Sequence, residues 1–313
     1  MVALWALVLV VALVPGCRSE SASSASSAAS EGPSEGRKEL GARPIRVAMS
    51  AAFVSDSGFY IYEQIADYLA GEIGHPVEFV TGLGYQTIND MLVDGAIDVG
   101  FVCGLPYVLL RDREQPAVSL LAAPVMRAPR YGGKPEYYSD LIVRADSDID
   151  SFDDLAGRVF VYNEEISNSG YNMPRHRLLR AGLTEGYFGT VLRSGSHEES
   201  IRMVAEGKAD ASFVDSLVLE HEQSQGSPRS RQVAVIDSIG PAGIPPVVVS
   251  NHVSPALRQE LARELLSMHE SPSGRAILQR AAVERFVSVS DDNYDSIREM
   301  YKGAQEAGYT RIR

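Results

Sequence analysis

From residue 43 onward, short apolar runs rich in β-branched residues alternate with amphipathic stretches of helical length. The clearest helical stretch, 59–73, places Ile65, Leu69 and Ile73 on one face, and short apolar runs precede and follow it. Strands that alternate with helices in this way are typical of an α/β fold with mainly parallel sheets. The first series predicts strands at 45–49, 77–80, 98–102 and 118–122, and helices at 59–73, 85–92 and 107–110.

The alternation starts again near residue 138, which indicates a second unit. It predicts strands at 138–144, 159–162, 190–193, 211–214, 232–236 and 247–249, with a helical turn at 152–155 and helices at 170–181 and 198–206. Two such series favour two lobes with a ligand cleft between them. We expect lobe 1 to comprise 43–137 and 246–313 and lobe 2 to comprise 138–245, with crossovers near 138 and 245. The alternative is one larger doubly wound sheet with a helical tail.

The C-terminal part is predicted to be helical, over 255–268, 272–282 and 293–308. Each helix is preceded by a residue type that commonly caps helix N-termini, namely Ser254, Ser271 and Asp291.

Residues 1–16 form an apolar run of the length of a signal peptide, shorter than the roughly 20 residues of a membrane-spanning helix. The run leads into LVPGC at 13–17, which resembles a bacterial lipobox and makes Cys17 the candidate lipidated residue. The Ser-rich stretch that follows is poor in large apolar residues, so we expect 17–42 to form a flexible tether. The alternative is an uncleaved N-terminal anchor helix. Both interpretations place the folded part outside the cytoplasm.

Charge and cysteine content narrow the possible functions. The 313-residue chain has a formal net charge of −12, which argues against a nucleic-acid partner but allows a small anion to bind at local dipoles. Only Cys17 and Cys103 are present, so no disulfide framework supports the fold. His-Glu-x-x-His, Walker and dinucleotide-binding patterns are absent, and we expect neither an enzyme nor a bound metal or cofactor.

Two helix starts in the second series carry residues suited to an anion. The segment 167–170 (SNSG) follows one predicted strand, and Ser196-His197 follows the next. Helix N-termini that follow successive parallel strands meet at one sheet edge, where open α/β sheets bind ligands. The simpler alternative is that these residues only cap their helices. Asp215 follows a third strand and belongs at the same edge, where it would suit a ligand amine or would cap a helix.

These motifs together resemble periplasmic phosphonate- and phosphite-binding proteins, which are type 2 periplasmic binding proteins of ABC importers. The resemblance rests on YYSDLIV at 137–143, DDLAG at 153–157, SNSGY at 167–171, GSH at 195–197, GKADA at 207–211 and GIPP at 243–246. It implies a two-lobed fold in which Ser167, Asn168, Ser169 and His197 hold an oxyanion. Tyr85 and Tyr138 would come from the other lobe or the hinge, and Asp215, with Glu164 and Glu220 as further candidates, would meet a ligand amine. Asn168 and CGLPY at 103–107 depart from the family pattern.

The resemblance implies an extracytoplasmic, monomeric lipoprotein that delivers a phosphonate, phosphite or phosphate to a membrane permease with its ATPase. Three alternatives remain open: a ligand sensor for a receptor or kinase, an importer protein for sulfonate or another small solute, and a secreted enzyme.

Overall fold

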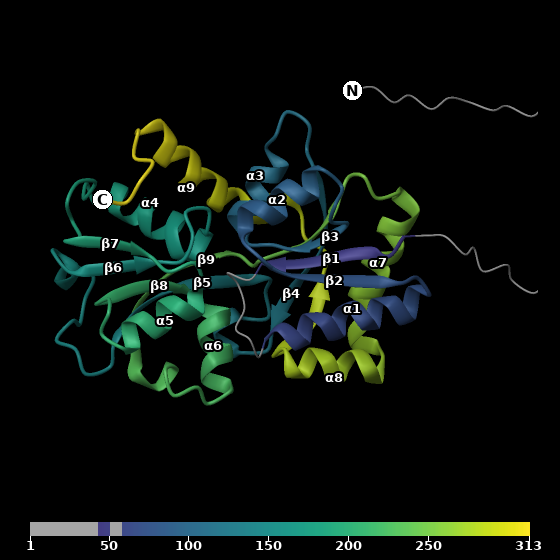
Figure 1. Ribbon diagram of the computed structural model, residues 1–313, viewed down its shortest axis with the longest axis horizontal. Helices are drawn as coiled ribbons and strands as arrows, with labels where there is room; N and C mark the ends of the chain where they lie inside the picture. Colours follow the sequence, from purple (N-terminus) through teal and green to yellow (C-terminus); the bar gives the residue numbers. More distant parts are fainter. Residues whose placement is uncertain (1–42, 51–57) are drawn as a thin grey trace, which may run out of the picture. The chain divides into compact units, whose positions relative to one another are not determined.

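The computed structural model describes residues 43–50 and 58–313, which form two mixed sheets with helices on both faces (Figure 1). The predicted signal segment, Cys17 and the Ser-rich tether lie outside these residues. No helix within the described part of the chain is long and apolar enough to cross a membrane.

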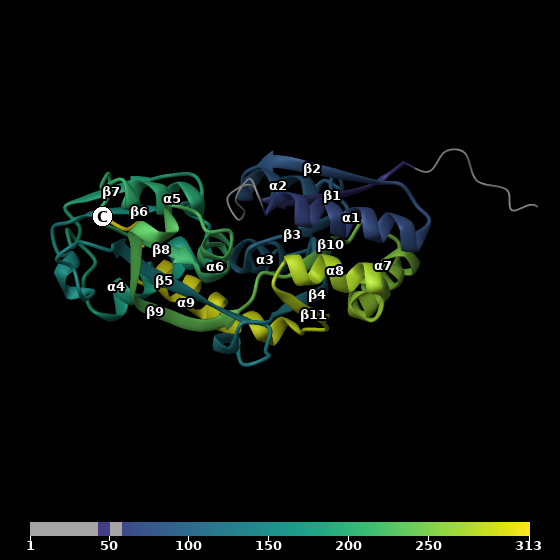
Figure 2. The same ribbon diagram turned by 90° about the horizontal axis from the view of Figure 1, so that it is seen from below.

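Lobe 1 contains a six-stranded sheet in the order β11-β4-β10-β3-β1-β2. Helices α1, α7 and α8 cover one face, and α2 and α3 cover the other (Figures 1 and 2). Its strands are β1 (Ile45–Ser50), β2 (Val77–Leu83), β3 (Val99–Phe101), β4 (Val118–Met126), β10 (Val247–Ser250) and β11 (Val283–Val287). Its helices are α1 (Phe59–Ile73), α2 (Tyr85–Val93), α3 (Gly104–Arg111), α7 (Pro255–Ser267) and α8 (Pro272–Arg280).

Lobe 2 contains a five-stranded sheet in the order β7-β6-β8-β5-β9. Helices α5 and α6 lie on one face and α4 and α9 on the other (Figures 1 and 2). Its strands are β5 (Glu136–Arg144), β6 (Val159–Tyr162), β7 (Thr190–Arg193), β8 (Ala211–Asp215) and β9 (Val233–Gly243). Its helices are α4 (Met173–Arg180), α5 (His197–Ala205), α6 (Ser216–Ser224) and α9 (Asp295–Glu306), and a short π-helical turn, η3 (Asn168–Asn172), precedes α4.

Period-2 alternation decides which face of the lobe 2 sheet each side chain enters. Leu141 of β5 joins Phe160 and Phe213 in the core beneath α4, whereas its neighbour Ile142 joins Val161 in the core beneath α5 and α6. The same alternation at the start of β5 determines which tyrosine faces η3, as described below.

The predicted two-lobed α/β architecture is confirmed, but the expectation of mainly parallel sheets is wrong. The pairs β1–β2, β1–β3, β6–β7 and β6–β8 are parallel, whereas five other pairs are antiparallel. The antiparallel pairs arise because β5 and β9 run in opposite directions between the lobes, and β10 and β11 return into lobe 1. The strand β11 lies in a segment that the sequence analysis had placed between two helices.

The chain end departs from the expected division. Tyr309 and Ile312 belong to the lobe 2 core, and the Ile312 N–H donates to the Tyr171 hydroxyl at 3.0 Å. Residues near the C-terminus therefore pack on lobe 2, although the sequence pattern assigned the whole of 246–313 to lobe 1.

The predicted caps Ser254 and Ser271 are confirmed, since each side chain accepts a backbone N–H of its helix. Asp291 is not a cap: Ser290 caps the turn before α9, and Asp291 accepts hydrogen bonds from Tyr107 and Arg298.

Candidate functional site

The C-terminal ends of the parallel strands β6, β8 and β7 each lead into a helix start at one edge of the lobe 2 sheet. Ser167 is the N-cap of η3, Ser196 is the N-cap of α5, and Asp215 is the N-cap of α6. Each cap side chain accepts a backbone N–H, which satisfies one donor of its helix start. The cap interpretation and the site interpretation are compatible, because Ser167 Oγ and the Asp215 N–H also lie within hydrogen-bond distance of the His197 ring.

His197, the first residue of α5, lies at the centre of this edge and is fully buried. Its Nδ1 accepts the Asp215 backbone N–H at 3.3 Å, so the proton of the neutral ring lies on Nε2. That Nε2 is 3.5 Å from Ser167 Oγ and 3.4 Å from Ser169 Oγ. Burial lowers the pKa of His197 to about 3, so the ring is a neutral donor directed between two hydroxyls.

Asp215 is fully buried, and its two carboxylate oxygens differ. Oδ1 accepts the Leu217 N–H at 2.8 Å, whereas Oδ2 has no hydrogen-bond partner. Burial is the main cause that raises the pKa of Asp215 to about 8. At neutral pH the group is therefore largely a neutral carboxylic acid, and a neutral acid donates a hydrogen bond.

Lobe 1 contributes residues from the starts of α2 and α3. The Tyr85 side chain begins α2, is 2% exposed and has a hydroxyl without a partner; its pKa lies well above 10, mainly because of burial. Cys103 precedes α3, and its Sγ accepts the Asn168 N–H at 3.4 Å. Burial raises the pKa of this thiol to about 11, so it is a packed thiol rather than a reactive one.

The Asn168 side chain forms hydrogen bonds with neighbouring side chains of the protein. Its amide Nδ2 donates to the Tyr137 hydroxyl at 2.9 Å, and its Oδ1 accepts from Asn172 at 3.0 Å. The Asn168 side chain is thus used by protein partners, which differs from the direct ligand contact that the resemblance implied for it.

Tyr138 lies apart from these residues. Its ring packs under the Arg130 guanidinium, 4.8 Å away, and its backbone N–H donates to Ser216. Strand alternation explains this: Tyr137 and Ser139 point toward η3, and Ser139 Oγ donates to the Ser169 carbonyl at 2.6 Å, whereas Tyr138 points to the opposite face. Tyr137 was missed by one position, although the alternation of β5 carried the signal.

Two other predicted acidic residues are engaged elsewhere. Glu164 is paired with Arg193 at 2.5 Å, and Glu220 lies 3.4 Å from Arg130. Arg130 itself forms two hydrogen bonds with the buried Asp140, at 2.8 and 2.9 Å. None of the described ion pairs or hydrogen bonds places an Arg or Lys side chain on Ser167, Ser169, His197 or Asp215.

Asn163 directly follows β6 and lies beside the same helix starts, and no sequence pattern pointed to it. It is fully buried, and neither its Oδ1 nor its Nδ2 has a partner. Gly170 is required beside it, because a Cβ at position 170 would come within 2.0 Å of Asn163 Oδ1. We call the assembled group of buried, mainly polar side chains the polar cluster; it consists of Tyr85, Cys103, Tyr137, Ser139, Asn163, Ser167, Asn168, Ser169, His197 and Asp215.

The polar cluster offers hydroxyl, imidazole, amide and carboxylic acid groups, all neutral, at converging helix N-termini. Such a set binds an oxyanion through preorganised dipoles, without a countercharge. The residues 48–294 match the family model described as "ABC transporter, phosphonate, periplasmic substrate-binding protein".

The chain belongs to this phosphonate-binding protein family. Family membership gives it the role of an extracytoplasmic substrate-binding protein for an ABC transporter, with a small ligand and a permease and ATPase as partners.

Solved structures support the fold. A binding-protein component of an ABC phosphonate transporter from Pseudomonas aeruginosa has a TM-score of 0.75 and 21% identity, over 86% of this chain and 89% of that chain. The methylphosphonate complex of PhnD1 from Prochlorococcus marinus has a TM-score of 0.74 and 19% identity, over 84% and 98%. A Xanthomonas citri protein solved with ATP has a TM-score of 0.64 and 18% identity, also over 84% and 98%.

Proposed function

We propose that this family member binds a small phosphorus oxyanion, a phosphonate, phosphite or phosphate, in the polar cluster and delivers it to the importer as a lipoprotein anchored through Cys17. The observation that carries the proposal is His197 Nε2, a neutral N–H donor 3.5 and 3.4 Å from the hydroxyls of Ser167 and Ser169. Three donors at the N-termini of two neighbouring helices match the tetrahedral oxygens of a phosphorus oxyanion.

Each group has a distinct task in this proposal. Ser167, Ser169 and His197 donate to the ligand oxygens from lobe 2, and the unpartnered Tyr85 hydroxyl donates from lobe 1. Asp215 Oδ2, also unpartnered, carries a proton and donates to a further oxygen. Asn168 and Tyr137 hold η3 in position, and Tyr138 has no contact with the ligand.

The number of donors is sufficient for a transport protein. Hydrogen bonds to a charged group contribute about 1.5–3 kcal/mol each. A micromolar dissociation constant corresponds to about −8 kcal/mol. Five donors therefore reach that range after the cost of ordering the ligand and bringing the lobes together.

Phosphorus is favoured over sulfur by Asp215 as well as by the family. A protonated carboxyl can donate to an oxyanion, and it can also accept the acidic proton that phosphonate and phosphate monoanions keep, whereas sulfate and sulfonates carry no such proton at neutral pH. The methylphosphonate found in the Prochlorococcus marinus relative agrees with this preference.

A thermal-shift screen of the purified protein tests the proposal. The panel contains phosphate, phosphite, methylphosphonate, 2-aminoethylphosphonate, sulfate and taurine. A ligand at 100 times its dissociation constant adds about 2.7 kcal/mol, which raises the Tm of a protein of this size by about 4–5 °C.

We expect a shift with at least one phosphorus compound, weakened about tenfold or more in affinity by Ser169→Ala. The matched control is Ser273→Ala, an exposed serine at the start of α8. A shift with sulfate or taurine alone would contradict the ligand class, and unchanged affinity in Ser169→Ala would contradict the site.

A further inference from the structure

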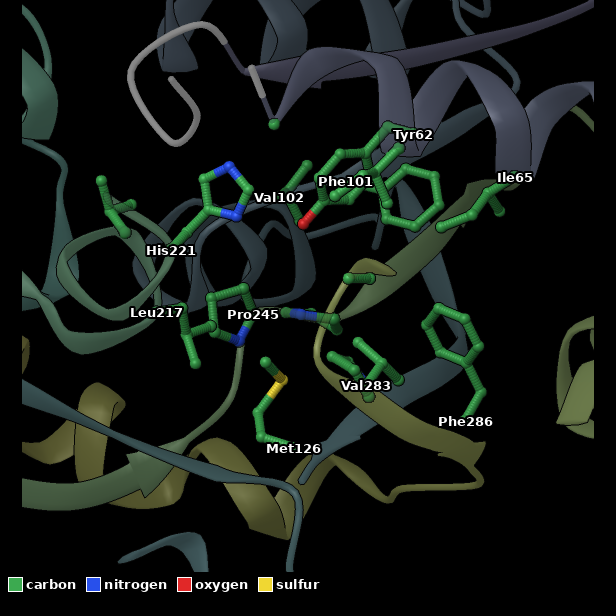
Figure 3. A pocket seen from close by; sticks show the side chains of 16 residues that line it. Tyr62, Ile65, Phe101, Val102, Met126, Leu217, His221, Pro245, Val283 and Phe286 are labelled. Carbon is green, nitrogen blue, oxygen red and sulfur yellow. The ribbon is translucent and has the colours of Figure 1, made fainter. Parts of the chain in front are cut away.

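An apolar pocket lies beside the polar cluster and is not used by the proposed oxyanion contacts. It encloses about 80 Å³ between helix α1, the end of β3, strands β4 and β11, and helix α6 (Figure 3). We call it the apolar pocket and define it by Tyr62, Phe101, Met126, Leu217, Val283 and Phe286. Its volume is of the same order as the apolar cavity of about 150 Å³ that stays dry and takes up benzene.

The apolar pocket and the polar cluster share two stretches of chain. Val102 lines the pocket, and the next residue, Cys103, belongs to the cluster. Leu217 lines the pocket, and its N–H donates to Asp215 Oδ1 at 2.8 Å. The second oxygen of that carboxyl, Oδ2, is buried without a hydrogen-bond partner, and the charge of Asp215 acts on Tyr62 of the pocket. A ligand held in the cluster therefore has the pocket next to it.

The lining suits an uncharged, apolar group. None of the described residues that line the pocket is Asp, Glu, Lys or Arg. Its polar groups are the Tyr62 hydroxyl and the His221 ring, which Figure 3 shows on the same side of the pocket. Burial lowers the pKa of His221, so its ring is neutral at neutral pH. The described lining residues thus offer no carboxylate to an ammonium group, and burial of an unpaired charge is costly.

A small inorganic anion bound at the polar cluster would make no favourable contacts with the apolar pocket. Phosphite and phosphate have no atoms beyond the oxyanion, and a methyl group reaches little of the pocket. An apolar chain would bury its surface against Leu217, Met126 and Phe286, and each buried CH₂ strengthens binding by roughly fourfold.

We propose that the ligand is an organophosphonate whose apolar substituent, a short alkyl chain or a phenyl ring, occupies the apolar pocket while its oxyanion binds the polar cluster. This inference rests on the proposed function, because the oxyanion must bind at the cluster to place the substituent. Leu217 is the specificity-determining residue, since it contacts both the pocket and the Asp215 carboxyl.

Isothermal titration of the purified protein with phosphite, methylphosphonate, n-butylphosphonate and 2-aminoethylphosphonate tests the inference. We expect n-butylphosphonate to bind at least about tenfold more tightly than methylphosphonate, from three further CH₂ groups. In Leu217→Phe, which fills the pocket from a partly exposed position on α6, the affinity ratio of butyl to methyl should fall to about one or below. Leu257→Phe, a partly exposed leucine on α7, is the matched control and should keep the ratio.

The outcomes separate the inference from the proposed function. If methylphosphonate or phosphite binds and n-butylphosphonate binds equally or more weakly, the inference is overturned and the proposed function stands. Tighter binding of 2-aminoethylphosphonate than of n-butylphosphonate also overturns it. If no phosphorus compound binds, both proposals fail. A butyl preference that survives in Leu217→Phe would show that the substituent lies elsewhere.

Discussion

At the scale of single residues, the polar cluster obtains its donors by keeping titratable groups neutral. The backbone N–H of Asp215 fixes the His197 tautomer, and burial keeps both side chains uncharged at neutral pH. A charged imidazolium would attract any anion. A neutral N–H, two hydroxyls and a carboxylic acid instead bind best an anion whose oxygens lie where these donors point. In the proposed site, selectivity for one anion would thus not depend on general attraction to negative charge, which the net charge of −12 opposes.

The buried carboxyl predicts a pH dependence that Asp215→Asn should remove. The pKa of Asp215 in the folded protein is about 8, above its ordinary value of 3.8, so folding retains a proton that the unfolded chain releases. The stability that comes from the proton is fully present below about pH 4 and is lost as the pH rises through about 8. In Asp215→Asn, the side-chain amide oxygen can still accept the Leu217 N–H, and the side chain cannot ionise.

Urea unfolding of the ligand-free wild type and of Asp215→Asn at pH 5, 7 and 9 measures this effect. We expect the free energy of unfolding of the wild type, relative to that of the variant, to decrease from pH 5 to pH 7 and again from pH 7 to pH 9. Parallel stability curves across this range would contradict a proton on Asp215. In the same variant, loss of binding restricted to 2-aminoethylphosphonate would indicate that Asp215 pairs with a ligand amine instead.

At the scale of elements, the site depends on helix starts that approach each other closely. The η3 turn and its N-cap carry two of the four proposed donor groups of lobe 2, and Gly170 lets the turn lie against Asn163 and His197. A Cβ at this position would come within 2.0 Å of Asn163 Oδ1 and 3.1 Å of His197 Cε1. The backbone conformation of Gly170 is an ordinary one, so only steric exclusion explains the glycine.

Gly170→Ala should therefore destabilise the protein by about 1–3 kcal/mol through overpacking and weaken oxyanion binding about tenfold or more, because Ser169 must move. Gly303→Ala on α9 is the matched control: its Cβ has no heavy atom within 4 Å, and alanine in a helix interior stabilises by about 0.5–1 kcal/mol. Urea unfolding and titration calorimetry measure both effects. Gly170→Ala with unchanged stability and affinity would show that η3 has room to shift without loss of function.

Most elements could be predicted because apolar periodicity is local. The helix Phe59–Ile73 and the strands Val159–Tyr162 and Thr190–Arg193 have the predicted bounds. β11 was missed because a five-residue segment after a helix carries no period of its own, and its strand conformation depends on pairing with β4. The direction of β10 was likewise set by a crossover between sheets, which local sequence does not encode.

The site could be predicted where its residues follow strands, and less well where they lie within one. Ser167, Ser169, His197 and Asp215 meet because successive parallel strands end at one edge. Tyr137 and Tyr138 are adjacent and chemically identical, so only the register of β5 distinguishes them. Asn163 has no signal in the sequence, since its role appears only when Gly170 is packed against it.

At the scale of the whole molecule, the proposed ligand binding and the proposed membrane attachment lie in separate parts of the chain. The described residues of the polar cluster and of the apolar pocket lie in 58–313, whereas the proposed lipid acceptor, Cys17, lies outside the described residues. The chain contains two cysteines, Cys17 and Cys103, and the structure describes the second of them. Cys103 is fully buried, with a pKa raised to about 11, so its thiol is inaccessible to an acyl transferase.

This division predicts opposite effects for the two cysteine variants. Acyl chains hold a protein at a membrane by about 0.8 kcal/mol per buried CH₂, so Cys17→Ala should lose incorporation of a labelled fatty acid and appear in the soluble fraction, with unchanged affinity for its anion. Cys103→Ala should keep the label and the membrane fraction, but lose affinity, because the Asn168 N–H loses its acceptor beside the bound oxyanion. Fatty-acid labelling and fractionation of both variants measure lipidation and membrane attachment, and calorimetry measures their affinity for the anion. Label that persists in Cys17→Ala would exclude Cys17 as the acceptor, and anchoring without any label would favour an uncleaved helix at the N-terminus.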